Sequence, residues 1–224
     1  MNPFGEGVET PENYEQKCLC ILVLDVSGSM GGQPISELNK GLQDFHQEVL
    51  KDFVAAQRLE VAIITFGSNI NTVQEPALVN NFQMPTLSTS GTTKLVDAVK
   101  MSINLVENRK QWYKKTGQNY YRSMIVLVTD GEPDSDQDIN GLAIDVQSGV
   151  LNKKFTFYSL GVRGYNHAKL ASITPPNMPP LPLDGYKFSE FFKWLSNSIG
   201  IITKSTEGEI LALPPVSGWT QIQI

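Results

Sequence analysis

The stretch LCILVLDVSGS at residues 19–29 decides the fold of this chain. Its first six residues are continuously apolar, which is typical of a strand buried on both faces of a parallel sheet. Asp25, Ser27 and Ser29 follow at alternate positions, where this strand should end and turn. Carboxylate and hydroxyl oxygens suit a hard cation such as Mg²⁺, and open α/β sheets bind ligands beyond the carboxyl ends of their strands. The stretch therefore predicts a metal site at a strand end, with capping of the next helix as the structural alternative.

Length and composition set the bounds for this prediction. The chain has 224 residues, 41% hydrophobic and 18% charged, which fits one α/β domain with short extensions. A net charge of -5 argues against non-specific binding to nucleic acid or to an anionic membrane. No apolar run reaches the ~20 residues of a membrane span, and the N-terminus has no signal-peptide pattern. The only cysteines, Cys18 and Cys20, are expected to be small buried side chains, so a cytoplasmic location is expected.

Strands and helices are predicted to alternate along the chain. Apolar strands are expected at residues 61–66, 124–129 and 155–162, with a weaker edge strand at 71–79 that contains Pro76. Apolar residues at helical spacing predict helices over 34–52, from 95 onward, and over 139–151 and 189–205. This order predicts an α/β fold with a doubly wound, mostly parallel central sheet flanked by helices on both faces. We expect an N-terminal arm (1–16), one domain (17–205) and a C-terminal extension (206–224), which would dock through Trp219 or bind a partner.

Two further loops are expected at the same edge of the sheet. The turn at residues 88–93 supplies Thr92 or Thr93, and the strand at 124–129 is followed by Asp130. With the first loop, they provide two carboxylates and three hydroxyls, which would partly fill the shell of a six-coordinate cation. The joint occurrence of the three loops is more specific than any one of them.

The three loops resemble the von Willebrand factor type A family, whose fold is Rossmann-like. Asp25-Val26-Ser27-Gly28-Ser29 matches the Asp-x-Ser-x-Ser element, Gly91-Thr92-Thr93 is similar to the threonine loop, and Thr129-Asp130-Gly131-Glu132-Pro133 is similar to the third loop. The resemblance implies a metal-ion-dependent adhesion site that holds Mg²⁺, with Mn²⁺ or Ca²⁺ as alternatives. The metal ligands that it implies are Asp25, Ser27, Ser29, Thr92 and Asp130.

The resemblance also implies how a partner would bind. A protein partner would supply a Glu or Asp side chain to the open coordination position. The residues expected to contact that partner are Gly28, Met30, Gly91, Thr93 and Glu132. The tail LPPVSGW at residues 213–219 is similar to stand-alone bacterial members associated with tellurium resistance and stress operons. We therefore expect a non-enzymatic, metal-dependent protein-binding module of a stress-response or signalling system, with no nucleic-acid or membrane partner.

Two other functions stay open at this point. Asp25 at a strand end could act as the nucleophile of a Mg²⁺-dependent phosphotransfer enzyme. Phosphatases that resemble haloacid dehalogenase carry a second Asp where this chain has Ser27, which disfavours that function. The second alternative is a scaffold whose metal is only structural.

Several weaker signals are given structural interpretations. Residues 136–141 resemble the start of an EF-hand loop, but the twelfth position is Gln147, so a solvated acidic loop is expected. His46 and His167 are expected on the surface. Arg109 is expected near the end of the second long helix, where a cation favours the helix dipole.

Overall fold

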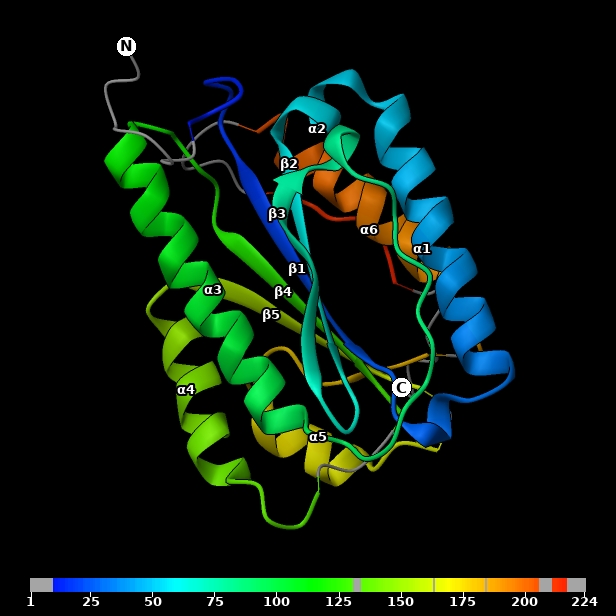
Figure 1. The fold of residues 1–224 in the computed structure, drawn as a ribbon. Helices are drawn as coiled ribbons and strands as arrows, with labels where there is room; N and C mark the ends of the chain where they lie inside the picture. Colours follow the sequence, from blue (N-terminus) through cyan, green and yellow to red (C-terminus); the bar gives the residue numbers. More distant parts are fainter. Residues whose placement is uncertain (1–9, 131–133, 163, 184, 206–210, 217–224) are drawn as a thin grey trace.

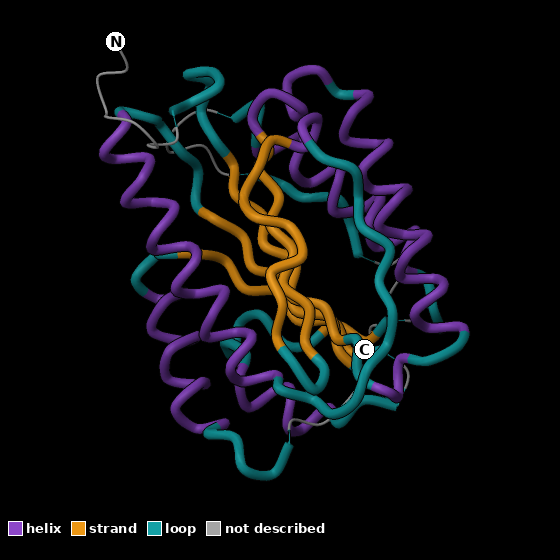
Figure 2. Tube along the Cα trace, viewed as in Figure 1, coloured by secondary structure: helices purple, strands orange, loops and turns teal. Residues whose placement is uncertain are grey.

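The centre of the molecule is a six-stranded sheet in the order β3-β2-β1-β4-β5-β6. This computed structural model describes residues 10–130, 134–162, 164–183, 185–205 and 211–216. The strands are β1 (Cys18–Asp25), β2 (Leu59–Phe66), β3 (Ile70–Leu78), β4 (Ser123–Thr129), β5 (Phe155–Gly161) and β6 (Leu181–Pro182). Only β3 runs antiparallel to its neighbour. Helices cover both faces (Figures 1 and 2), which confirms the predicted fold class.

The helices form one layer on each face of this sheet. One layer holds α1 (Gln33–Lys51), α2 (Phe53–Arg58) and α6 (Phe188–Ile202). The other holds α3 (Leu95–Thr116), α4 (Ile139–Leu151) and α5 (His167–Ile173). Two short 3₁₀ helices, η1 (Gly28–Met30) and η2 (Val79–Asn81), complete the described elements.

The buried strand β1 explains the continuous apolar run in the sequence. All eight of its residues are buried. Alternate side chains point to opposite faces, as in any strand. Cys20 and Leu22 pack in the core under α1 and α6, while Ile21 and Val23 pack in the core under α3 and α4. Residues 18–24 of β1 are therefore all apolar, Asp25 at its end is the one buried carboxylate of the strand, and both cysteines are buried free thiols.

Short elements are the ones that the sequence did not reveal. The helices α2 and α5 have six and seven residues, and β6 has two. Such segments are too short to show a helical or strand period. The bounds of the longer elements differ from the predicted ones by only a few residues, and α4 agrees at both ends.

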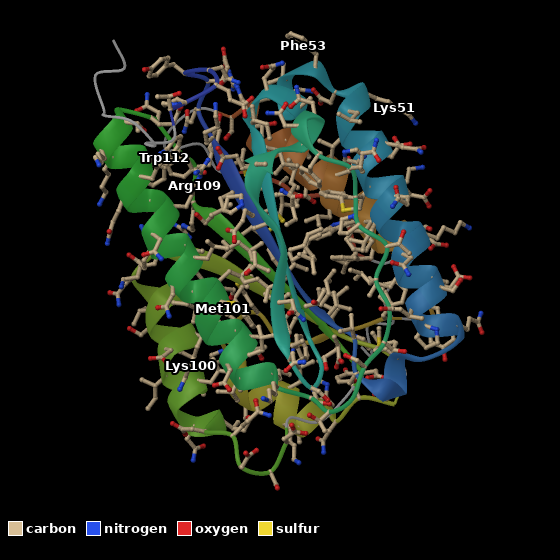
Figure 3. The ribbon with its side chains drawn as sticks, viewed as in Figure 1. Lys51, Phe53, Lys100, Met101, Arg109 and Trp112 are labelled. Carbon is tan, nitrogen blue, oxygen red and sulfur yellow. The ribbon has the colours of Figure 1, made fainter. Side chains whose placement is uncertain are left out.

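The expectation for Arg109 is wrong. The helix α3 continues to Thr116, so Arg109 lies inside it and its side chain is buried. Its Nε donates to Glu60 Oε2 and its Nη2 to Glu60 Oε1, both at 2.8 Å. Tyr113 donates its hydroxyl to Glu60 Oε2 at 2.6 Å. Glu60 lies near the start of β2, so this buried ion pair joins α3 to the amino end of that strand. Arg109 is labelled on α3 in Figure 3.

The described parts of both extensions contact the domain. Glu15 of the N-terminal arm pairs with Arg58, with Nη2 and Oε2 2.7 Å apart, and its carbonyl accepts a hydrogen bond from Gln118. In the C-terminal extension, the carbonyl of Pro214 accepts a hydrogen bond from the Trp194 indole at 2.8 Å. Trp219, the expected docking residue, lies outside the described residues. No helix among the described residues is long and apolar enough to cross a membrane.

The two outer strands of the sheet are irregular or short. The pairing of β3 with β2 has register shifts on either side of Ile63, in the middle of β2, and Pro76 lies within β3. At the other edge, β6 pairs with β5 through Leu181 and Pro182 alone. A proline cannot donate a backbone hydrogen bond, so it is tolerated at edges such as these.

Candidate metal centre

The predicted metal ligands gather where the order of the strands reverses. After β1 the chain builds β2 and β3 on one side and β4, β5 and β6 on the other. Ligands of doubly wound sheets bind at this reversal, beyond the carboxyl ends of the strands. Asp25 is the last residue of β1, and Asp130 directly follows β4. The two strands are parallel neighbours (Figure 1), so their carboxyl ends, which carry Asp25 and Asp130, lie at the same end of the sheet.

Asp25 organises the turn after β1 from a fully buried position. Its Oδ1 accepts the backbone N–H of Ser27 at 2.8 Å, and its Oδ2 accepts the hydroxyl of Thr129 at 2.6 Å. Burial raises the pKa of the Asp25 carboxyl above its usual range, while the hydrogen bonds from Ser27 and Thr129 oppose that rise. Both oxygens therefore fix loops, and they add negative charge beneath the site.

The hydroxyls form a chain from Asp25's loop to Asp130. The Oγ atoms of Ser27 and Ser29 lie 3.0 Å apart. Ser29 donates to Asp130 Oδ1 at 2.8 Å. Ser27 is buried, Ser29 is exposed and Asp130 is half-buried, so the set opens toward solvent on one side. Burial raises the pKa of Asp130, and the hydrogen bond from Ser29 opposes the rise.

Backbone hydrogen bonds hold the loops against one another. The N–H of Gly28 donates to the carbonyl of Gly91 at 3.0 Å, and that of Ser90 donates to the carbonyl of Val26 at 2.6 Å. Gly91 has a φ of 66°, which favours glycine, and a Cβ there would lie 1.5 Å from Ser68 Oγ. A Cβ on Gly67 would lie 2.2 Å from the carbonyl oxygen of Ser90. These two glycines allow the close approach of the threonine loop to the turn that follows β2.

The structure treats the two threonines of that loop differently. Thr92 is exposed, and its N–H donates to Ser68 Oγ at 3.2 Å. Within the described residues, no hydrogen bond joins the Thr92 hydroxyl to the other four side chains predicted as ligands. Thr93 is 8% exposed, and its N–H donates to Asp134 Oδ1. Thr92 is thus the threonine that faces solvent next to the site.

Not all residues predicted to contact a partner are on the surface. Gly28 and Gly91 are exposed, as expected. Met30 is fully buried, because η1 turns its side chain into the core under α1, so the expectation that it contacts a partner is wrong. Thr93 is buried as described above, which removes it from a contact surface. Glu132 lies outside the described residues.

The donor set fits a hard cation. It consists of carboxylate and hydroxyl oxygens, and burial raises the pKa of both carboxyls, a cost that a bound cation would offset. Over the described ranges, no group of three or more His, Cys, Asp or Glu side chains could hold a metal ion. A metal here would therefore depend on the serine hydroxyls, which suits Mg²⁺ better than a softer metal.

Thr129 is a residue of this site that was not predicted as a ligand or partner contact. Its place in the third-loop motif and at the end of an apolar strand is visible in the sequence, but the hydrogen bond from its hydroxyl to Asp25 is not. The signal was its position directly before Asp130, on the strand that neighbours β1.

The weaker signals have structural explanations. Asp138 caps α4, and its Oδ1 accepts the N–H of Gly141 at 2.8 Å. His167 is exposed, as expected. His46 is only partly exposed, and its Nε2 lies 2.8 Å from the carbonyl oxygen of Val79.

Comparison with known proteins identifies the family. The family model for the von Willebrand factor type A domain matches residues 20–182. The chain belongs to the von Willebrand factor type A domain family. Its matched segment begins within β1 and ends with β6, so the family domain contains every strand and every loop of the candidate site. No curated protein matches the chain significantly.

Solved structures share the fold of this von Willebrand factor type A domain. The pilus adhesin SpaC from Lactobacillus rhamnosus GG is 14% identical with a TM-score of 0.65; the match covers 85% of this chain and 31% of that one. The ArnB paralog VWA2 from Sulfolobus acidocaldarius is 16% identical with a TM-score of 0.57, covering 83% and 46%. The vWF domain of the pili tip protein Mfa5 from Porphyromonas gingivalis is 12% identical with a TM-score of 0.59, covering 88% and 99%. The chain thus spans less than half of the first two proteins.

Proposed function

We propose that this domain is a metal-dependent protein-binding module that engages an acidic side chain of its partner through a Mg²⁺-type adhesion site. The observation that carries the proposal is the hydrogen-bonded set of Asp25, Ser27, Ser29 and Asp130 at the strand reversal. A cation bound there would supply an electrophilic centre for a foreign carboxylate.

Each residue of the site has its own role in this proposal. Ser27 and Ser29 would ligate the cation through their hydroxyls, and Asp130 would balance its charge directly or through water. Asp25 is buried and fully engaged with Ser27 and Thr129, so it would orient the ligands from below. Thr92, exposed beside the site, would join the shell when a partner arrives.

Direct titration tests the metal site. Mg²⁺, Mn²⁺ and Ca²⁺ would be titrated calorimetrically into chelator-treated protein. Ser27→Ala and Asp130→Asn should weaken binding about 10–100-fold or more. The control is Ser189→Ala, which removes a similar hydroxyl–carboxylate hydrogen bond, to Asp44, on the α1–α6 face. Equal affinity for all four proteins would refute the site.

Partner capture then tests the function. Wild-type protein on a resin should retain specific proteins from its native lysate with Mg²⁺ and release them with EDTA, and Ser27→Ala should retain none of them. Retention that survives both EDTA and Ser27→Ala contradicts adhesion through the metal and points to a scaffold with a structural metal. Mg²⁺-dependent cleavage of p-nitrophenyl phosphate that Ser27→Ala abolishes would instead indicate a phosphotransfer enzyme.

The proposal includes a cellular setting, a cytoplasmic stress-response or signalling system. It is supported by the resemblance of the tail at residues 213–219 to stand-alone bacterial members associated with tellurium resistance. Cell fractionation with an antibody against this chain tests it, because recovery in the surface or secreted fraction would contradict a cytoplasmic role.

A further inference from the structure

A groove between α3 and α4 lies on the face opposite to α1 and α6. Its volume is about 380 Å³. Ile103 and Ile144 supply apolar surface to it, and the buried Phe155 lies behind them. Lys100, Lys154 and one acidic residue, Asp145, also line it. Lys100 is labelled on α3 in Figure 3, whereas its neighbour Met101 faces β3 and contacts Thr72. Ile144 is 68% exposed and Leu151, two turns further along α4, is 83% exposed, so this apolar surface is open to solvent.

Positive charge continues from the groove toward the amino-end edge of the sheet. Lys110 donates a hydrogen bond from its Nζ to the carbonyl of Lys154, which fixes the two residues side by side. Lys114 and Arg122 are near enough that they, like Lys154, lower the pKa of Lys110, in addition to the larger effect of burial. Glu107 opposes this effect, and its Oε1 lies 3.7 Å from Lys154 Nζ.

The charges of the whole chain are strongly segregated. Residues 100–122 and 139–154 together carry eight Lys and Arg but only two Asp and Glu. Of these eight, only Arg109 is buried against Glu60. The rest of the chain has ten Lys and Arg and 21 Asp and Glu. A basic surface is therefore built on a protein that is otherwise acidic, and it would steer an acidic ligand to this face.

We infer that the α3–α4 groove is a second protein-binding surface, and that it binds an acidic peptide segment carrying apolar anchor side chains. The apolar floor would take the anchor, and Lys100, Lys110 and Lys154 would pair with flanking carboxylates. Duplex nucleic acid fits less well, because it offers no apolar side chain for Ile103 and Ile144 and is repelled by the acidic remainder of the chain. This surface is distinct from the candidate metal centre. Lys110 and Lys154 lie toward the amino ends of the strands, whereas the metal centre lies beyond their carboxyl ends.

Fluorescence anisotropy tests the inference without the metal. The probe is a short, labelled glutamate-rich peptide with leucine side chains, titrated with the protein in EDTA at low salt, so that failure of the metal site does not affect the result. Lys110→Glu/Lys154→Glu should weaken binding at least about tenfold. Ile144→Ser should also weaken it, by removing part of the apolar floor. The matched control is Lys40→Glu/Lys193→Glu, which makes the same change in net charge at two exposed lysines of α1 and α6.

Each outcome decides the inference. Loss of binding in the groove variants with the control unchanged supports it. It is overturned if the wild type does not bind the peptide, or if the control weakens binding as much as Lys110→Glu/Lys154→Glu does. Duplex DNA of the same total charge serves as a competitor, and DNA that displaces the peptide at equal or lower concentration overturns the assignment to a protein segment. Circular dichroism of each variant verifies that it is folded.

Discussion

Replacing Arg109 by methionine should destabilise the protein by about 3–5 kcal/mol, because it leaves the Glu60 carboxylate buried without its cation. The burial and the geometry of this ion pair place the expected loss of stability toward the upper end of that range. Glu60 is 3% exposed and Arg109 is 8% exposed. Two parallel hydrogen bonds of 2.8 Å join them, and Arg109 lies 3.9 Å above the Trp112 ring.

Urea unfolding followed by circular dichroism measures the change. Thermal unfolding gives a second measure: at about 2–4 °C per kcal/mol for a chain of this size, the melting temperature should fall by roughly 6–20 °C. The double variant Glu60→Leu/Arg109→Met should regain most of the loss, because no unpaired charge stays buried. Tyr113→Phe should cost about 1.5–3 kcal/mol, as it removes a hydrogen bond to a charged group.

The control is an exposed ion pair. Lys51→Ala breaks the pair with Glu48, whose side chains are 68% and 41% exposed, and should cost no more than about 1 kcal/mol. If Arg109→Met costs as little as Lys51→Ala, the reasoning from burial is refuted. Affinity for Mg²⁺ at the candidate site should stay unchanged in Arg109→Met, since the ion pair lies at the amino end of β2 and the candidate metal centre at the carboxyl ends of β1 and β4.

Two further predictions concern other parts of the fold. Gly67→Ala should weaken Mg²⁺ binding in the calorimetric titration and destabilise the protein by about 1–3 kcal/mol, because its Cβ would force the Ser90 carbonyl away. The control is Gly200→Ala, whose Cβ would lie 3.4 Å from Asp52 Oδ2 and should leave Mg²⁺ affinity unchanged. Asp52→Ala should cost about 1 kcal/mol at neutral pH in urea unfolding, because Asp52 caps α2, while Asp52→Asn should cost less because it keeps the cap. Burial alone would raise the pKa of Asp52, but hydrogen bonds from Lys204 and from the N–H groups of Ala55 and Val54 lower it overall. Its contribution to stability is therefore present above the unfolded pKa of about 3.9 and should disappear as the pH falls through the lower folded pKa; a penalty that persists at lower pH would contradict this.

Much of the fold could be predicted because burial on both faces of the sheet leaves a plain pattern. The apolar runs of β1, β2, β4 and β5 end in polar loops, and the predicted bounds of α4, residues 139–151, agree with the structure at both ends. What failed depends on tertiary contacts. Arg109 has the same local sequence whether α3 ends nearby or continues, and only the position of Glu60 across the sheet makes it a buried residue.

The candidate site shows the same division. The oxygen side chains and the loops that carry them could be read from the sequence, since strand order alone brings Asp25 and Asp130 to one edge. The burial of each side chain could not be read from the sequence. Met30 looks like a loop residue, yet the tight turn of η1 sends it into the core. The role of Thr129 depends on the register between β1 and β4, which local sequence does not encode.

The two outer strands of the sheet, β3 and β6, have a consequence for how this protein behaves at high concentration. Exposed edge strands offer unpaired backbone groups on which a second chain can add and start aggregation. The register shifts and Pro76 in β3 interrupt one such template, and β6 offers only two residues, one of them Pro182, on the other side. Contacts with other chains through sheet extension are thereby disfavoured at both edges, which leaves side-chain surfaces as the means of association.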